Sequence, residues 1–356
     1  MSPMNRRRFL RTSALAPAAC LLDGRAFAVE AAAPFKSGPP PLPGKDSFTI
    51  AVLPDTQMYC RQHPAGFHAQ TQWLVDNKRA RNIAAVLHLG DITDNNTTQQ
   101  WEVAQAAMKR LDGQLPYFLV PGNHDYSEGG KATDRTSLLD EYFPRAKFEK
   151  LATFGGTYDR EPGSMANSYH LFSAGGKDFL VIGLEFGPRA DVVRWANEVA
   201  AQHAGREAIL ITHAYTYLGN VRHDWQKFGT KQNWNPHSYA VAKNTDHDVM
   251  DGEQLWQNLI SKHENFILTL NGHILRTGLA RLTSPTPGGR GVHQMLVNFQ
   301  MKPNGGDGWL RLMEFTTRGT VEIYDYSPTL DRSNLGDQNR FTLELAKVGG
   351  VMQDRR

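Results

Sequence analysis

Five short apolar runs, each about the length of a buried strand, are followed by a side chain that can bind a metal ion. The runs and the residues behind them are 48–53 with Asp55, 83–89 with Asp91, 117–120 with Asn123, 209–211 with His213, and 266–270 with His273. In open α/β sheets, ligands bind beyond the carboxyl ends of the strands, so residues far apart in sequence can converge there. The sequence therefore predicts one site assembled from five strand ends.

Helical patterns lie between several of these runs. Apolar residues at helical spacing predict helices over 68–81, 97–111, 191–202 and 251–263. The last of these opens with Asp251 and Gln254, which are spaced as in a capping box. Since strands that alternate with helices are typical of parallel pairing, the first three runs are expected to form a parallel sheet.

Strand-like runs come in closer succession after residue 168. They cover 169–172, 179–184, 278–282, 294–299, 310–315 and 321–324. This mix favours a second, largely antiparallel sheet packed on the first. A chain of 356 residues with 40% hydrophobic content can bury one large core, and we expect a single α/β domain over 48–346.

Short sequence motifs around the five strand ends make the prediction more specific. They are Asp55-Thr56-Gln57, Gly90-Asp91-Ile92-Thr93-Asp94, Gly122-Asn123-His124-Asp125, Thr212-His213 and Gly272-His273. In this order, from about residue 48 to 326, they resemble the calcineurin-like metallophosphoesterases. The resemblance implies a four-layer α/β/β/α sandwich and a site for two divalent metal ions, of Mn, Fe, Zn or Mg.

The resemblance also implies a role for each ligand. Asp91 would bridge the two ions, and Asp55 would bind the first. Asn123, His213 and His273 would bind the second. Two divalent ions outweigh the charge of two carboxylates, so the pocket would stay positive and attract a phosphate anion.

His124 directly follows a ligand, so it can point at the substrate while its neighbour faces the metal. By the same resemblance, His124 would contact the phosphoryl group and help to protonate the leaving oxygen, with Asp125 holding its imidazole. Asp94 would orient a ligand from outside the coordination sphere. The implied reaction is hydrolysis of a phosphomonoester or phosphodiester by attack of a metal-bound hydroxide, and the implied partner is a small phosphorylated substrate.

Two positions depart from the family pattern. Gln57 and Leu275 stand where the family has histidines, and both losses fall on the first metal ion. The amide oxygen of Gln57 is a possible ligand, and it would make the first site harder and weaker. The first ion is then loosely held, or is a hard ion such as magnesium or manganese, or borrows an imidazole. The histidines available for borrowing are His63, His68, His223, His237 and His247. An alternative is a degenerate family member that acts as a metal-containing binding protein.

The segment 215–250 is long and has no steady period. It is either a functional loop over the site or a disordered insertion, and its aromatic residues favour order. The candidates for contacting substrate are Trp225, Trp234, His223 and His237.

The first 28 residues have the composition of a secretory signal. Arg6 and Arg7 precede a short apolar stretch and the small-residue exit Ala26-Phe27-Ala28, which is typical of the twin-arginine variety. The stretch is too short to span a bilayer, so no stable membrane insertion is expected. Residues 29–47 are Pro- and Ala-rich and predict a linker, and 347–356 a tail. The expected partner is the twin-arginine export machinery, and the expected location is the periplasm or outside the cell.

Charge and cysteine content exclude two classes. Removal of residues 1–28 takes away five arginines and one aspartate, so the formal net charge changes from +3 to −1. No basic stripe remains for a nucleic-acid polymer. Only Cys60 would be left of the two cysteines, so no intrachain disulfide can support the mature fold.

Overall fold

The structure is a computed structural model that describes residues 34–244 and 248–345. The predicted signal, the tail and His247 lie outside these residues. Ten α-helices occur in the described part: α1 Gln57–Gln62, α2 Pro64–Asn77, α3 Thr98–Met108, α4 Leu139–Tyr142, α5 Arg145–Phe148, α6 Ala190–Gln202, α7 Trp225–Phe228, α8 Ala240–Asn244, α9 Gly252–Asn258 and α10 Pro303–Gly306. Six 3₁₀ turns join them: η1 Lys109–Leu111, η2 Asn123–Asp125, η3 Glu128–Gly130, η4 Gly229–Lys231, η5 Pro236–Ser238 and η6 Ile260–Lys262.

The first sheet has eight strands in the order β1-β16-β15-β14-β2-β3-β4, with β17 also paired to β15. Its strands are β1 Phe35–Ser37, β2 Phe48–Leu53, β3 Ile83–His88, β4 Tyr117–Leu119, β14 Leu310–Phe315, β15 Thr320–Ser327, β16 Arg332–Asn334 and β17 Arg340–Glu344. Strands β2, β3 and β4 are parallel, as the alternation of strands and helices predicted.

The second sheet has seven strands in the order β12-β13-β11-β8-β7-β6-β5. They are β5 Phe154–Thr157, β6 Ser168–Ala174, β7 Lys177–Leu184, β8 Glu207–Thr212, β11 Phe266–Asn271, β12 Leu279–Pro285 and β13 Gly291–Val297. A small separate hairpin joins β9 Thr216–Tyr217 to β10 Val221–Arg222.

The pairing of the later strands differs from the prediction in two ways. The second sheet is parallel through its centre, because α6 and α9 make crossovers between β7 and β8 and between β8 and β11. The runs 310–315 and 321–324 belong to the first sheet, where β14 pairs antiparallel with β2. Periodicity predicts that a strand exists but not which strand it pairs with.

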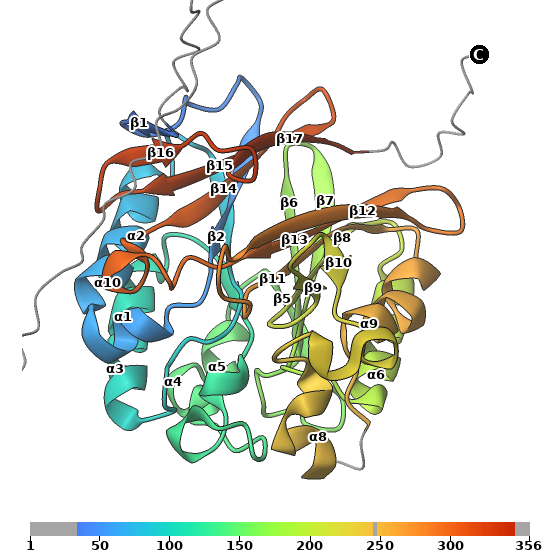
Figure 1. Cartoon of the computed structure of the whole chain (residues 1–356). Helices are drawn as coiled ribbons and strands as arrows, with labels where there is room; N and C mark the ends of the chain where they lie inside the picture. The colour runs from blue at the N-terminus through green and yellow to red at the C-terminus, as the bar shows by residue number, and fades with distance from the viewer. Residues whose placement is uncertain (1–33, 245–247, 346–356) are drawn as a thin grey trace, which may run out of the picture. The chain divides into compact units, whose positions relative to one another are not determined.

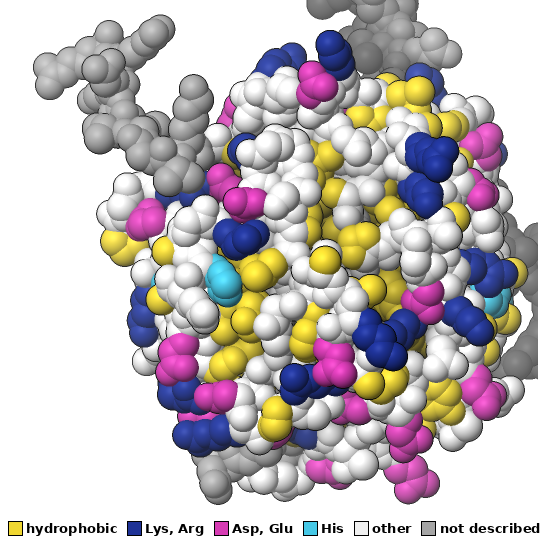
Figure 2. Space-filling model, turned by 180° about the vertical axis from the view of Figure 1, so that it is seen from behind, with side chains coloured by type: hydrophobic (Ala, Val, Ile, Leu, Met, Phe, Trp, Pro, Cys, Tyr) yellow, Lys and Arg dark blue, Asp and Glu magenta, His cyan; other side chains and the backbone are white. Residues whose placement is uncertain are grey.

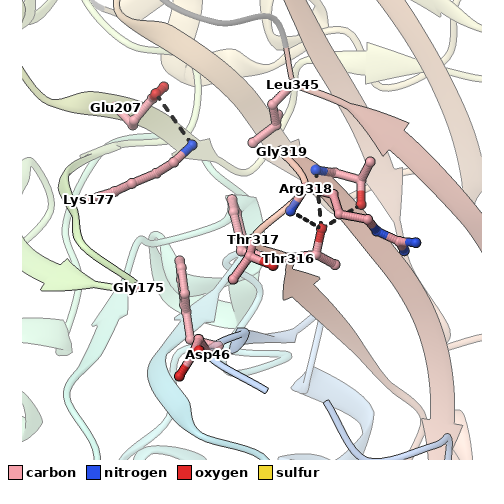
Figure 3. A pocket seen from close by; sticks show the side chains of 12 residues that line it. Asp46, Gly175, Lys177, Glu207, Thr316, Thr317, Arg318, Gly319 and Leu345 are labelled. Atoms are coloured by element: carbon pink, nitrogen blue, oxygen red, sulfur yellow. Dashed lines mark hydrogen bonds and ion pairs between the residues drawn. The ribbon is translucent and has the colours of Figure 1, made fainter. Parts of the chain in front are cut away.

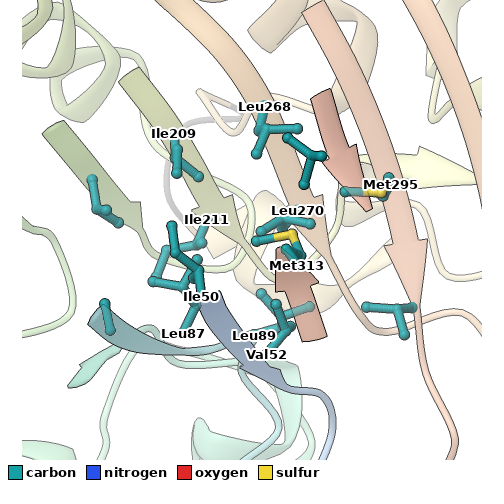
Figure 4. Close-up of a cluster of buried hydrophobic side chains, with 14 of the residues drawn as sticks. Ile50, Val52, Leu87, Leu89, Ile209, Ile211, Leu268, Leu270, Met295 and Met313 are labelled. Atoms are coloured by element: carbon teal, nitrogen blue, oxygen red, sulfur yellow. The ribbon is translucent and has the colours of Figure 1, made fainter. Parts of the chain in front are cut away.

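The two sheets face each other and helices cover both outer faces (Figure 1). Helices α1–α3 pack on the first sheet, and α6 and α9 pack on the second. Between the sheets, buried aliphatic side chains from both inner faces interdigitate; those labelled in Figure 4 are Ile50, Val52, Leu87, Leu89, Ile209, Ile211, Leu268, Leu270, Met295 and Met313. This arrangement confirms the predicted α/β/β/α sandwich.

Part of the segment expected as a linker belongs to the domain. Strand β1 pairs with β16, and the guanidinium of Arg81 donates hydrogen bonds to the carbonyl oxygens of Pro40 and Pro41 at 2.8 and 3.1 Å. Proline lacks an N–H but keeps a carbonyl acceptor, so a Pro-rich segment can still be fastened in this way.

Charged side chains of both signs share one face of the molecule. Figure 2 shows the face opposite to that of Figure 1, where Lys and Arg side chains are interspersed with Asp and Glu. Within the described ranges, none of the helices has the length and apolar character needed to cross a bilayer.

A cavity of about 610 Å³ opens at the amino ends of β2 and β8, near the turns after β6 and β14 (Figure 3). Lys177 and Glu207 form an ion pair of 3.9 Å in its wall. The predicted metal ligands follow the carboxyl ends of the parallel strands, so this cavity is not their site.

Candidate metal centre

Three of the predicted ligands lie together at the carboxyl ends of strands from both sheets. The ligand atoms of Asp91, His213 and His273 are all within 4.8 Å of one another, and all three residues are buried. Asp55 is joined to them, because its Oδ2 accepts a hydrogen bond from the backbone N–H of His273 at 2.9 Å. The strand ends therefore converge although Asp55 and His273 are 218 positions apart.

Backbone carbonyls fix the two imidazoles. Nδ1 of His213 lies 2.8 Å from the carbonyl oxygen of Leu89, and Nε2 of His273 lies 2.7 Å from that of Trp234. A carbonyl can only accept, so each of these nitrogens carries a proton and the other nitrogen is the one that can bind a metal. The free Nε2 of His213 is 3.1 Å from Oδ2 of Asp91.

The glycines of the motifs have a steric reason. A Cβ on Gly122 would lie 2.2 Å from Oδ1 of Asp91, and one on Gly272 would lie 1.9 Å from Oδ1 of Asp55. Both distances are far below contact, so any side chain at these positions would displace a carboxylate. Glycine is thus required in the Gly-Asn and Gly-His motifs because each loop passes close to a predicted ligand on another loop.

Asp55 is held by residues that the sequence did not reveal. Its Oδ2 also accepts from Nδ2 of Asn298 at 2.8 Å and lies 3.4 Å from Nε2 of Gln300. The two amides follow β13, a sixth strand end at this edge. The predicted strand 294–299 extended past the true end at Val297 and so included Asn298. A shorter run would have placed both amides with the other ligands.

Three buried oxygens of predicted ligands have no hydrogen-bond partner within the described residues: Asp55 Oδ1, Gln57 Oε1 and Asn123 Oδ1. Leaving a buried acceptor unsatisfied costs about 1–3 kcal/mol, so three of them on predicted ligands are costly for a fold alone. A divalent cation would satisfy them. The residues present therefore fit the metal that the motifs imply.

The pKa shifts of the buried ligands also favour bound cations. Burial raises the pKa of Asp55 to about 8, an effect that the charge of His213 opposes and that of Asp91 reinforces. Burial also disfavours the charged form of Asp91, but His213 and His124 outweigh it and the pKa falls. Asp91 likewise outweighs burial at His213, whose pKa rises to about 9. Two buried carboxylates at one place cannot both stay ionised without cations beside them.

The role expected for Asp125 is wrong. Its buried carboxylate accepts hydrogen bonds from the backbone N–H groups of Ile92, Thr93 and Gly122 at 2.7–3.0 Å, and among the described residues it makes none to the imidazole of His124. Asp125 instead joins the two loops that carry Asp91 and Asn123. A carboxylate next to a histidine in sequence need not point at it, since η2 turns the two side chains apart.

Asp94 makes the contact with His124 that was expected of Asp125. Nδ1 of His124 lies 2.8 Å from the carbonyl oxygen of Asp94 and 3.7 Å from its Oδ1. Burial alone would lower the pKa of His124, but Asp91 and Asp94 raise it above its usual value. Asp94 therefore orients His124 and is not seen to orient a metal ligand.

The segment 215–250 is ordered where the structure describes it. It forms β9, β10, α7, α8 and two 3₁₀ turns, and it reaches the site through the Trp234 carbonyl on His273. The side chain of Trp234 is partly exposed, whereas Trp225 and His237 stack on each other with ring centroids 5.9 Å apart. His237 also binds Gln254 through Nε2 at 2.6 Å.

The candidate histidines are not part of the ligand cluster. Among the described residues, the His, Cys, Asp and Glu side chains whose ligand atoms lie together are Asp91, His213 and His273. The cluster therefore includes none of His63, His68, His223 or His237, although the ring of buried His223 lies 6.1 Å from that of His273.

Comparisons with known proteins agree with this geometry. The family model of the calcineurin-like phosphoesterases matches residues 48–311. The chain is 29% identical over 317 residues to the uncharacterized protein YvnB of Bacillus subtilis, covering 85% of this chain and 22% of that protein. It is 41% identical over 69 residues to the probable glycerophosphodiester phosphodiesterase GpdQ of Arcobacter nitrofigilis, covering 17% of this chain and 24% of that protein.

The chain thus spans less than a quarter of the length of these curated relatives. Among solved structures it is similar to the purple acid phosphatase PPD1 from yellow lupin (Lupinus luteus) seeds, with a TM-score of 0.48, 13% identity, and coverage of 86% of this chain and 55% of that one. The family model alone covers well over half of the 356 residues. The chain belongs to the calcineurin-like phosphoesterase family.

Proposed function

We propose that this protein is a metal-dependent hydrolase of phosphomonoesters or phosphodiesters. The observation that carries the proposal is that three predicted ligands have buried, unpartnered oxygens while the imidazoles of two others are fixed by backbone carbonyls. The first cation would be held by Asp55, Asp91 and Gln57. The second would be held by Asp91, Asn123, His213 and His273.

Bound divalent cations make water acidic enough to act as a nucleophile at neutral pH and offset charge on the phosphoryl oxygens. The rest of the reaction belongs to His124. Its Nδ1 proton is engaged by the Asp94 carbonyl, so Nε2 is the atom left to face substrate. As the water oxygen bonds to phosphorus and the ester P–O bond breaks, protonated Nε2 can donate its proton to the leaving oxygen.

The donor atoms also bear on metal identity. The second cation would have two nitrogen ligands, which suit zinc, iron or manganese. The first would have oxygen ligands alone, which favour a hard ion such as magnesium or manganese. We therefore propose a site with unequal cations, the first held less tightly.

The test is turnover of 4-nitrophenyl phosphate and bis(4-nitrophenyl) phosphate by protein loaded in turn with Mn²⁺, Mg²⁺, Zn²⁺ or Fe²⁺. We expect release of 4-nitrophenol with at least one metal and loss of activity on chelation. His203→Ala, a change at a histidine beyond the end of α6, is a matched control that should keep activity. A loaded, folded chain that turns over neither ester would contradict the proposal.

That negative result would favour a second function, a family member that keeps the fold and one cation as a binding protein. Gln57 and Leu275 motivate this alternative, because both replace histidines of the family pattern. The ordered contact of His124 with Asp94 argues against it, since a binding protein has no need to fix a proton donor.

We also propose that the protein is exported by the twin-arginine route. The support is the pair Arg6-Arg7 before a short apolar stretch and Ala26-Phe27-Ala28. Replacing Arg6 and Arg7 by lysine keeps the charge but removes the arginine pair. We expect the double variant to stay uncleaved in the cytoplasm, and its accumulation outside the cytoplasm would exclude this route.

A further inference from the structure

Arg61 stands beside the predicted proton donor without belonging to the metal site. It lies one turn after Gln57 on α1, and residues four apart share one face of a helix. The Gln57 side chain is buried and its amide oxygen has no partner among the described residues, whereas the Arg61 side chain is 47% exposed, so the guanidinium reaches solvent. Its Nη1 donates a hydrogen bond to Oδ2 of Asp94 at 3.0 Å.

One carboxylate therefore separates Arg61 from His124. Oδ2 of Asp94 takes the guanidinium, and its Oδ1 is 3.7 Å from Nδ1 of the imidazole. The side chain of Asp94 is only 8% exposed, whereas those of Arg61 and His124 are 47% and 35% exposed. Two groups that can carry positive charge thus cover one buried anion and face solvent together.

Gly130 packs closely against the contact between Asp94 and His124. This glycine has φ of +65°, and a Cβ added to it would lie 2.4 Å from the carbonyl oxygen of Asp94 and 3.1 Å from Nδ1 of His124. Neither the Asp94 carbonyl nor the His124 imidazole can therefore move towards Gly130. The geometry around Asp94 is fixed by packing, unlike that of an ordinary ion pair between two exposed side chains.

We infer that Arg61 is a specificity-determining residue for phosphoesters whose leaving group carries a negative charge, such as a carboxylate or a second phosphate. This inference rests on the proposed function, in which His124 protonates the leaving oxygen. A guanidinium has five N–H donors, and Asp94 takes one of those of Arg61. Asp94 does not take the remaining donors, and the Arg61 side chain is 47% exposed, so they would be able to bind an anionic substituent through charge-assisted hydrogen bonds.

The test compares two substrates that differ by one carboxylate on the leaving group: 4-nitrophenyl phosphate and 3-carboxy-4-nitrophenyl phosphate. Hydrogen bonds to charged groups are worth about 1.5–3 kcal/mol, which corresponds to roughly tenfold or more in kcat/KM. We expect Arg61→Gln to lower kcat/KM for the carboxylated substrate roughly tenfold more than for the neutral one. Most of that extra loss should fall on KM.

Three controls separate this role from a structural one. Arg61→Lys keeps the charge and should recover part of the preference, and added salt should shrink it in the unchanged protein. Arg79→Gln removes an exposed arginine after α2 and should leave the preference unchanged. Metal content by elemental analysis should not change in any of these variants.

The possible failures are distinguishable. Equal losses on both substrates in Arg61→Gln, or the same shift in Arg79→Gln, would overturn the inference and leave the proposed function standing. An unchanged protein that turns over neither substrate when loaded with metal would overturn both.

Discussion

The two sheets contribute different chemistry to the same site. Strands β2, β3 and β4 of the first sheet end in oxygen donors, those of Asp55, Asp91 and Asn123. Strands β8 and β11 of the second sheet end in nitrogen donors, those of His213 and His273. The second cation would thus be bound across the sandwich, whereas the first would rest on ligands from the first sheet alone.

The contrast extends to how each ligand is held. The imidazoles are fixed by one carbonyl each, which leaves one nitrogen free. Asp55 is fixed by donors from the second sheet, His273 N, Asn298 and Gln300, which occupy one oxygen and leave the other free. The second sheet therefore supports the first cation's ligand without supplying a ligand atom. Because Gln57 and Leu275 replace the family's histidines, the site for the first cation would be weakened and that for the second cation would not.

The largest effect should follow removal of a ligand that joins the sheets. His213→Ala deletes an imidazole and leaves Asp91 buried without its ion-pair partner. Breaking a buried pair from one side costs about 3–5 kcal/mol, so the metal-free variant should unfold at lower urea than the metal-free parent. Elemental analysis should show loss of the second cation, and activity should disappear. Full metal content would remove His213 from the ligand set.

His124→Ala should affect chemistry more than stability. Because His124 is oriented by Asp94 and contributes no atom to the cluster of Asp91, His213 and His273, bound metal and the unfolding midpoint should stay close to those of the parent. Turnover should fall by roughly 10²–10⁴, the usual contribution of a positioned proton donor. The measurement is kcat beside elemental analysis on the same sample. A variant that loses metal would show that His124 is a ligand.

Most of the candidate ligands could be predicted from the sequence, because the end of a strand is a local signal. An apolar run followed by Asp or His places a ligand at a sheet edge whichever strands pair, so errors in pairing did not matter. Three features were beyond its reach. The partner of His124 depends on where η2 points a side chain, Asn298 depends on where β13 stops, and the order of strands depends on contacts far apart in sequence.

Restoring nitrogen to the first position would sharpen the comparison of the sheets. Leu275 is half-buried two residues after His273, and Gln57 is buried two residues after Asp55 with its amide oxygen unpartnered among the described residues. Even partners outside the coordination sphere change metal affinity roughly 10–100-fold, so Leu275→His, alone or with Gln57→His, should raise affinity for the first cation at least tenfold. After mild dialysis the parent should retain closer to one metal per chain and the variants closer to two.

The control for this restoration is Leu279→His, a half-buried leucine at the start of β12 on the same segment. It should not change metal retention. If the parent already holds two metals tightly and Leu275→His gains nothing, a residue other than those described on the Asp55 side must fill the gap. His247 would then be the first candidate for alanine replacement and metal counting.

The smallest effect concerns contact between the sheets away from the metal. The ring of His170 on β6 stacks on Phe118 of β4 with centroids 4.2 Å apart, and burial lowers its pKa to about 3. The unfolded chain binds this proton below its ordinary pKa of about 6.5 and the folded chain does not, so stability is lost as pH falls from 6.5 towards 3. Between pH 6.5 and pH 5 the loss from this one group is on the order of 1–2 kcal/mol. His170→Phe keeps a ring between the sheets and removes the proton, so urea unfolding should lose about that much of its pH dependence.

A measurement with and without Mn²⁺ serves as the control. Because the contact between His170 and Phe118 contains no metal ligand, the difference in stability between parent and variant should be the same in both cases. A difference that grows on adding metal would mean that the two ends of the interface between the sheets are energetically coupled.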